Sequence, residues 1–172
     1  MFDPDAADDR LGLVPLTRLL VERADMPVIA AGGIMDGNGI RAALDLGTIA
    51  AQLGTAFIAC PESSADDAYR AALLSPAAHH TVMTRAISGR PARCLANDFT
   101  AWDTETALTP PDYPLAYDIG KALNHTAKMA GNGGYGAQWA GQGAPLARSL
   151  PVSALMALLV AEMRAGQNQP GR

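Results

Sequence analysis

The sequence predicts an α/β fold in which short buried strands lie parallel and are joined by helices. Residues 27–47, PVIAAGGIMDGNGIRAALDLG, start with an apolar run, break at Gly32 and Gly33, and resume with helical spacing of apolar residues. The pattern repeats, because the apolar run TIAAQLG at 48–54 also ends at a glycine and precedes an acid-started helical segment at 62–74. Two consecutive strand, glycine-turn and helix units are typical of a parallel sheet.

Capping residues and prolines set the bounds of the first elements. Residues 10–24 carry a helical stripe of leucines, and Pro15 either lies in the first turn of that helix or kinks it. Residues 27–31 follow as a strand. We then expect a helix at 37–46 with Asp36 as its N-cap.

The second half of the chain is less regular. Its expected elements are, in chain order, a loop or edge element at 89–99, a proline-stiffened connector at 109–114, a helix at 115–130, an irregular glycine-rich stretch at 131–143, and a helix at 151–163 that Ser149 could cap. We expect one partial domain, with strand units in about residues 1–75, loops and helices in about residues 76–165, and a frayed tail at 166–172.

Composition limits the classes of function. The chain has 172 residues, of which 49% are hydrophobic and 17% charged, as in a soluble chain with one core. A net charge of −4 without any run of Lys or Arg argues against a nucleic acid or an anionic membrane as partner. No apolar run reaches the ~20 residues of a membrane span. Cys60 and Cys94 lie far apart and the chain starts with acidic residues, so we expect a cytoplasmic protein with reduced thiols.

One glycine motif resembles a dinucleotide-binding motif but lacks its structural context. Residues 131–136, GNGGYG, satisfy the G-x-G-x-x-G pattern of dinucleotide-binding folds. That pattern must follow a strand and open a helix, whereas here a helical segment precedes it and more loop follows. We therefore expect no dinucleotide site there.

The turns after the two predicted strands are better candidates for a ligand site. In parallel α/β structures, ligands bind beyond the carboxyl ends of the strands, where backbone N–H groups at glycine turns hold phosphate. Gly33 and Gly54 would let a phosphate approach the backbone, and Thr55 adds a hydroxyl donor. The alternative is that both glycines only close tight turns. Phosphate sites of (β/α)₈ barrels are often built from the loops after strands 7 and 8, so these units would be the last two of such a barrel.

Five segments together resemble the nitronate monooxygenase family, formerly called 2-nitropropane dioxygenases, over nearly the whole chain. They are PVIAAGGI, ALDLGTIAAQLGTAF, CPES, SGRPAR and WAGQGA. The resemblance implies an FMN-dependent oxidoreductase with a TIM-barrel core, which oxidises alkyl nitronates with O2 to a carbonyl compound and nitrite. It also implies that the FMN phosphate lies against Gly32, Gly33, Gln52, Leu53, Gly54 and Thr55.

Several residues allow either a site role or a structural one. Gln52 is a lone polar residue in an apolar strand, and if buried it needs a partner, which would be the cofactor or the backbone of the core. Arg90 and Arg93 could grip an anion, or could be surface residues paired with carboxylates. Tyr135 and Trp139 could wall a substrate site or pack in the core.

The catalytic base of the family is missing from its expected place. Members carry a Gly-Gly-His segment before the region that corresponds to residue 1, and its histidine is the expected base. His79, His80 and His125 do not follow an apolar strand, so none is expected to face a cleft at the strand ends. Two adjacent histidines without carboxylates or cysteines nearby also make a poor metal site. We assign no catalytic and no metal-binding residue.

Length agrees with a partial barrel. A (β/α)₈ barrel takes about 250 residues, so we expect the carboxyl-terminal part of an enzyme, with open strand edges that invite self-association. Its small-molecule partners would be an alkyl nitronate and O2. Two alternatives stay open: a non-catalytic remnant that binds a phosphorylated ligand or a partner chain, and another FMN-barrel oxidoreductase such as a flavin-dependent enoyl reductase.

Overall fold

The computed structural model describes residues 11–106 and 109–165. The contacts within the chain divide it into two compact units. Unit 1 combines Met1–Ser63 with Leu146–Arg172, and unit 2 is Ser64–Pro145, so the second unit is inserted into the sequence of the first. No helix in the described ranges is both long and apolar enough to cross a membrane.

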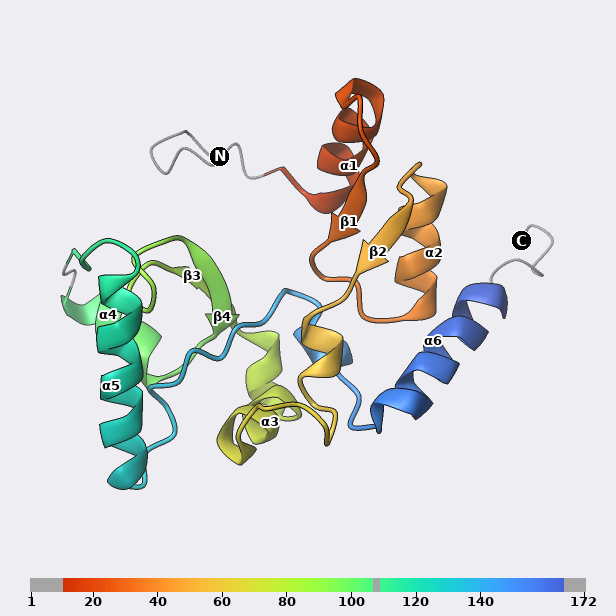
Figure 1. Ribbon diagram of the computed structural model, residues 1–172. Coiled ribbons are helices and arrows are strands. Elements are labelled where there is room, and N and C mark those ends of the chain that lie inside the picture. Colours follow the sequence, from red (N-terminus) through yellow and green to blue (C-terminus); the bar gives the residue numbers. More distant parts are fainter. Residues whose placement is uncertain (1–10, 107–108, 166–172) are drawn as a thin grey trace. The chain divides into compact units, whose positions relative to one another are not determined.

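Unit 1 contains a pair of parallel strands flanked by helices (Figure 1). Its elements are, in chain order, α1 (Leu13–Arg23), β1 (Ile29–Ala31), α2 (Gly37–Asp45), β2 (Ala50–Gln52), the 3₁₀ helix η1 (Thr55–Phe57) and α6 (Val152–Ala165). The register places Ile29 opposite Ala50 and Ala31 opposite Gln52. The parallel pairing that the two glycine-ended apolar runs predict is confirmed.

Proline, aspartate and glycine define the ends of these helices. Pro15 lies in the first turn of α1, where its missing N–H and fixed φ are tolerated. Asp36 caps α2, because its side chain accepts a hydrogen bond of 2.7 Å from the N–H of Gly39. Gly47 follows α2 with a φ of +99°, and a Cβ there would lie 2.8 Å from Cγ1 of Val21 on α1. The turn after α2 therefore requires glycine.

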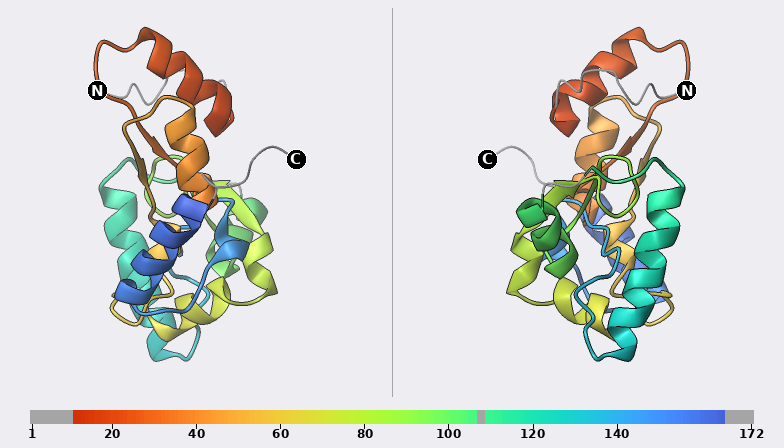
Figure 2. Two further views of the ribbon diagram at one scale, coloured as in Figure 1. Left: turned by 90° about the vertical axis from the view of Figure 1, so that its right-hand side faces the viewer. Right: turned by 90° about the vertical axis from the view of Figure 1, so that its left-hand side faces the viewer.

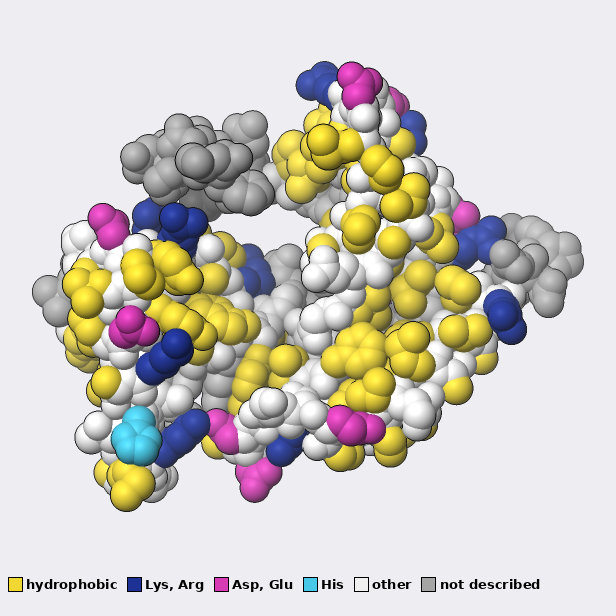
Figure 3. Space-filling view, in the orientation of Figure 1, with side chains coloured by type: hydrophobic (Ala, Val, Ile, Leu, Met, Phe, Trp, Pro, Cys, Tyr) yellow, Lys and Arg dark blue, Asp and Glu magenta, His cyan; other side chains and the backbone are white. Residues whose placement is uncertain are grey.

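Two apolar clusters form the core of unit 1. The buried members of the cluster between β1 and α2 are Ala30, Ile34 and Ala43. Those of the cluster between α6 and the chain after β2 are Cys60, Leu155 and Leu159. Ile40 and Leu53 pack against both clusters, so the two share one continuous apolar interior. A groove of about 280 Å³ lies between β2 and α6, and hydrophobic side chains gather over this region in the space-filling view (Figure 3).

Helix α6 packs against the start of α2 with backbone next to backbone (Figure 2). A Cβ on Gly37 would lie 2.3 Å from the backbone nitrogen of Met163 and 2.4 Å from the carbonyl oxygen of Leu159. Position 37 therefore has no room for a side chain. This contact fixes where the carboxyl-terminal helix sits on the strand and helix unit.

Unit 2 is built on an antiparallel hairpin of β3 (Thr81–Thr84) and β4 (Ala92–Leu95). Its other elements are α3 (Asp67–Leu73), the 3₁₀ helix η2 (Pro76–His79), α4 (Asp98–Thr106) and α5 (Leu115–Met129). A further 3₁₀ turn, η3 (Ala144–Leu146), lies where the chain returns to unit 1. Helices α5 and α6 both lie where the sequence predicts helices.

Three segments differ from the sequence-based expectation. The sequence predicts neither β3, which has only four residues, nor α4, whose apolar residues do not form a stripe. The helix expected at 62–74 begins only at Asp67, because Asp66 caps it by accepting a 2.8 Å bond from the N–H of Tyr69. The stretch at 89–99, expected as a loop or edge element, contributes β4.

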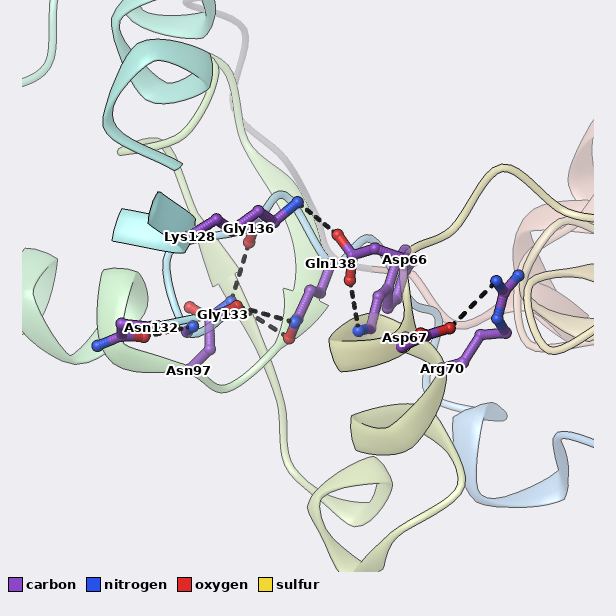
Figure 4. Close-up of polar contacts among 11 residues, drawn as sticks. Asp66, Asp67, Arg70, Asn97, Lys128, Asn132, Gly133, Gly136 and Gln138 are labelled. Atoms are coloured by element: carbon purple, nitrogen blue, oxygen red, sulfur yellow. Dashed lines mark hydrogen bonds and ion pairs between the residues drawn. The ribbon is translucent and has the colours of Figure 1, made fainter. Parts of the chain in front are cut away.

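The glycine-rich stretch is an irregular segment tied to the start of α4 (Figure 4). The side chain of Asn97 donates from Nδ2 to the carbonyl oxygen of Gly136 at 2.9 Å. A Cβ on Gly134 would lie 2.4 Å from Oδ2 of Asp98. A side chain at position 134 would therefore displace the carboxylate of Asp98.

Replacing Gly37 with alanine should destabilise unit 1, because the new Cβ would overlap the backbone of α6, which cannot rotate away as a side chain can. We expect the free energy of unfolding, measured by urea denaturation, to fall by about 1–3 kcal/mol, the usual effect of overpacking. The exposed neighbour Asn38 is the matched control, and Asn38→Ala should change it by less than about 0.5 kcal/mol. Equal changes in the free energy of unfolding for the two substitutions would contradict a tight contact between Gly37 and α6.

Candidate functional site

The two turns that the sequence singles out lie at the same end of the β1–β2 pair. Because the strands are parallel and Ala31 pairs with Gln52, both strands end at the same level (Figure 1). Gly32 follows β1 directly and Leu53 follows β2 directly. The fold therefore places the two stretches of candidate residues beside each other.

Both turns leave open space over their backbone. Gly32 has a φ of +110° and Gly33 a φ of +72°, values that residues with a side chain rarely adopt. Apart from its chain neighbours, a Cβ on Gly32 would meet no heavy atom within 4 Å, and the same holds for Gly54. All three glycines are exposed. A ligand group can thus reach the main chain directly at both turns.

The residues after β2 divide between core and surface. Leu53 is half-buried and packs against both apolar clusters, so its side chain belongs to the core. Gln52 is exposed, so its amide is not a buried core group bonded to backbone. The 3₁₀ helix η1 starts at Thr55, and the N–H of Phe57 donates to the carbonyl oxygen of Gly54 at 3.0 Å.

The loop between β1 and α2 is fastened at its far end to α6 and to the segment that precedes it. Ile34 and Met35 are buried, with 5% and 2% of their surface exposed. The carbonyl oxygen of Met35 accepts a 3.0 Å bond from Nη2 of Arg148, and the N–H of Gly37 donates a 2.9 Å bond to Oε2 of Glu162. Nη1 of Arg148 lies 2.6 Å from Oε1 of Glu162. Arg148 and Glu162 together form a clasp that joins the loop to the carboxyl-terminal segment.

The clasp is charged at neutral pH. The hydrogen bond from Arg148 lowers the pKa of the Glu162 carboxyl, partial burial opposes that shift, and the bond from the N–H of Gly37 lowers the pKa further. The carboxylate lies at the amino-terminal end of α2, where the helix dipole favours negative charge.

The candidate residues offer groups that bind ligands but no group that titrates near neutral pH. His79, His80 and His125 all lie in unit 2 and are exposed. Burial raises the pKa of the Cys60 thiol, and it raises that of Cys94 to about 11, so neither is a ready nucleophile. Within residues 11–106 and 109–165, no three His, Cys, Asp or Glu side chains gather closely enough to hold a metal ion.

The other residues that the sequence singles out have structural partners inside unit 2. Arg93 donates from Nη1 to a carbonyl of the neighbouring strand β3 at 3.2 Å. The guanidinium of Arg90 lies 5.3 Å from the centroid of the Tyr113 ring. Tyr135 and Trp139 are half-buried and pack against the apolar core of unit 2. These contacts favour the structural interpretation of all four candidates.

Sequence reasoning missed Arg148 and Glu162. The bond between Gly37 and Glu162 spans 125 positions, and no local motif connects them. One signal was present, because Glu162 is the single acid of the mostly apolar helix VSALMALLVAEMRA and lies near its carboxyl end. A helix dipole disfavours an acid at that end, so the residue needed a partner outside its own helix.

Known proteins of similar sequence match most of this chain. The family model described as nitronate monooxygenase matches residues 3–162. The chain belongs to the nitronate monooxygenase family. A nitronate monooxygenase of Paraburkholderia phytofirmans is 61% identical over 165 residues, and one of Pseudomonas aeruginosa is 52% identical over 165 residues. Each match covers 95% of this chain but only 45% and 47% of those relatives, so the chain spans about half the length of the family members that it matches.

Solved structures agree with the family assignment. A nitroalkane oxidase from Streptomyces ansochromogenes matches with a TM-score of 0.85 and 42% identity, covering 91% of this chain and 45% of that structure. FabK from Thermotoga maritima matches with a TM-score of 0.75 and 30% identity, covering 92% of this chain and 50% of that structure. The chain therefore shares its α/β fold with both.

The clasp predicts how the stability of the chain responds to acid. Because the pKa of Glu162 is lower in the folded than in the unfolded chain, its stabilisation is complete above the unfolded pKa of about 4.3 and is lost as the pH falls through the folded value. Glu162→Gln should therefore lower the free energy of unfolding by about 1–2 kcal/mol at neutral pH. The difference from wild type should shrink as the pH is lowered below about 4.3.

Urea denaturation over a pH series measures this difference. The matched control is Glu22→Gln, which removes the partner of Arg18 in an exposed pair on α1 and should change the free energy of unfolding by no more than about 0.5 kcal/mol. A Glu162→Gln effect that stays constant across the series would show that the charge of Glu162 does not stabilise the fold.

Proposed function

We propose that the complete protein uses FMN to oxidise alkyl nitronates with O2 to a carbonyl compound and nitrite, and that this chain supplies the part of the site that holds the FMN phosphate. The match of the nitronate monooxygenase family model to residues 3–162 carries the proposed activity. The two relatives at 61% and 52% identity and the nitroalkane oxidase structure support it.

The geometry of the glycine turns supports the position of the phosphate. Gly32 and Gly54 have open space where a side chain would be, so phosphate oxygens have room to reach main-chain N–H groups. The exposed amide of Gln52 and the hydroxyl of Thr55 add side-chain donors at the same strand ends. In this proposal the phosphate is held by neutral donors.

The chemistry divides between the cofactor, this chain and the rest of the protein. Bound FMN would supply the redox chemistry, because a flavin accepts electrons from an organic substrate and passes them to O2. The residues of this chain hold and orient the phosphate end. The base that handles the substrate proton is, in this proposal, the histidine of a Gly-Gly-His segment outside these 172 residues.

We infer that β1 and β2 are the last two strands of a TIM barrel. Within the described residues each strand has one neighbour, namely the other. Ile29, the first residue of β1, and Ile49, which precedes β2, are 54% and 65% exposed, an unusual amount of apolar surface for a parallel pair. The remaining strands would come from the part of the relatives that this chain does not match, and without them the open edges favour self-association.

The likeness to FabK favours a second candidate, another FMN-barrel oxidoreductase. The TM-score of 0.75 and the identity of 30% for FabK are lower than the values of 0.85 and 42% for the nitroalkane oxidase. Nitronate oxidation is therefore the better supported activity. An enoyl reductase would oxidise NAD(P)H only when an enoyl thioester is present. A non-catalytic remnant would retain no flavin.

Gly54→Val tests the phosphate site without disturbing the fold, since a φ of −106° suits valine and its Cβ would meet nothing within 4 Å. The test uses a complemented protein, in which this chain is joined to the part of the P. phytofirmans relative that it does not match. Fluorescence titration should show a loss of FMN affinity of about 10- to 100-fold, or 1–3 kcal/mol. The free energy of unfolding without FMN should change by less than about 0.5 kcal/mol.

Riboflavin, which lacks the phosphate, is the matched ligand for this test. Its affinity should be the same in the wild type and in Gly54→Val. Gly33→Val blocks the same site but places valine at a φ of +72°, so it should lose stability as well as FMN. Unchanged FMN affinity in a folded Gly54→Val protein would place the phosphate elsewhere.

Nitrite release from a propyl nitronate tests the activity. The 172-residue chain alone with added FMN should release little nitrite, because the base and the rest of the flavin site are absent. The complemented protein should be yellow and active, and replacing the Gly-Gly-His histidine with asparagine should slow it by at least about 100-fold.

The histidines of this chain provide the control for that assay. Replacing His79, His80 and His125 together with glutamine should leave most of the activity of the complemented protein, since all three are exposed residues of unit 2. Strong nitrite release by the chain alone, or a loss beyond about 100-fold in the triple variant, would mean that a base lies within this chain.

A further inference from the structure

We propose that the clasp of Arg148 and Glu162 positions the Gly32–Gly33 turn for the FMN phosphate by fixing the far end of the β1–α2 loop. The proposal rests on the proposed phosphate site and extends it to two residues that no sequence motif marks. Arg148 and Glu162 act through the loop as positioning residues and are not themselves phosphate ligands.

The loop needs fixing at both ends because its glycines are flexible. Only residues 32–36 join β1 to α2. Its amino-terminal end is held by the pairing of Ala31 with Gln52 in the sheet. Gly32 and Gly33 follow with positive φ, and a pair of glycines samples many backbone conformations unless the chain after it is held as well.

The clasp holds that second end in one geometry. Arg148 reaches the carbonyl oxygen of Met35 with Nη2 at 3.0 Å, and Glu162 accepts the N–H of Gly37 at 2.9 Å, so the bonds lie on either side of Asp36. The side chains of Arg148 and Glu162 are only 26% and 25% exposed, which limits the competition from water.

The support of the clasp is itself rigid. Glu162 stands on α6, whose Leu155 and Leu159 are buried in the core of unit 1. The backbone contact at Gly37 leaves α6 no freedom to shift toward α2. Through Glu162 the loop is therefore fastened to a fixed helix, and Arg148 is held by its ion pair with that same residue.

The clasp occupies the start of α2 and leaves the glycine turns as the place for an anion. The first N–H of α2, a group that would otherwise attract phosphate, already binds the carboxylate of Glu162. Arg148 lies 2.6 Å from that carboxylate and balances its charge. The N–H donors for the phosphate must then come from the turns. A turn that is ordered before binding loses less conformational entropy when the ligand binds.

Arg148→Met tests the proposal with two measurements. Hydrogen exchange of the 172-residue chain without any ligand should become about 10-fold faster or more at the amides of residues 33–37, because the loop opens locally. In the complemented protein, FMN affinity should fall about 10-fold while riboflavin affinity stays the same. Glu162→Gln serves as the second variant if Arg148→Met does not fold.

Arg18→Met is the matched control. Arg18 also bridges a backbone carbonyl and a carboxylate, since it donates to the carbonyl oxygen of Leu46 at 2.9 Å and to Glu22 at 2.8 Å. It does so at the opposite end of α2, away from the glycine turns. Its loss should change neither the exchange of residues 33–37 nor the preference for FMN over riboflavin.

The outcomes separate this inference from the phosphate site on which it rests. A wild-type complemented protein that binds FMN and riboflavin equally well overturns the phosphate site and the inference together. A wild type that prefers FMN, with the same preference in folded Arg148→Met, overturns the inference alone and leaves the clasp a purely structural role. Faster exchange together with a reduced preference for FMN supports positioning.

Discussion

The contact between α2 and α6 at Gly37 is the constraint on which unit 1 depends. Two helix backbones approach so closely there that residue 37 can carry only a hydrogen atom where other residues have a side chain. That approach brings Glu162 within reach of the first N–H of α2 and lets Leu155 and Leu159 complete the core next to Cys60. The packing of α6 and the bond of Glu162 to the start of α2 therefore have one common origin.

The candidate site combines rigid supports with an accessible backbone. The strands and the two apolar clusters hold the ends of both turns, whereas Gly32 and Gly54 keep the space over the backbone open. A site of this kind binds through main-chain groups, so the identity of a few small residues matters more than the presence of charged ones.

Local signals predicted the parts of the fold that depend on local physics. The parallel strands, the Asp36 cap and the position of α5 follow from hydrophobic spacing, capping and glycine turns. The sequence did not reveal β3, α4 or the division into two units, because short strands and weakly patterned helices take their structure from distant contacts. Gly32 and Gly33 could be singled out as a turn, whereas Arg148 and Glu162 could not, since their partners lie more than 100 positions away.

The split of unit 1 into two sequence segments has a consequence for how the chain folds. The bonds of Arg148 and Glu162 to the loop join positions 113 and 125 residues apart, with all of unit 2 between them. Such contacts form late because closing a long loop costs entropy. During synthesis the glycine turns leave the ribosome before α6, and the bonds of Arg148 and Glu162 to the loop can form only when α6 has emerged and docked. In the proposed site, retention of the cofactor would thus report whether α6 has docked.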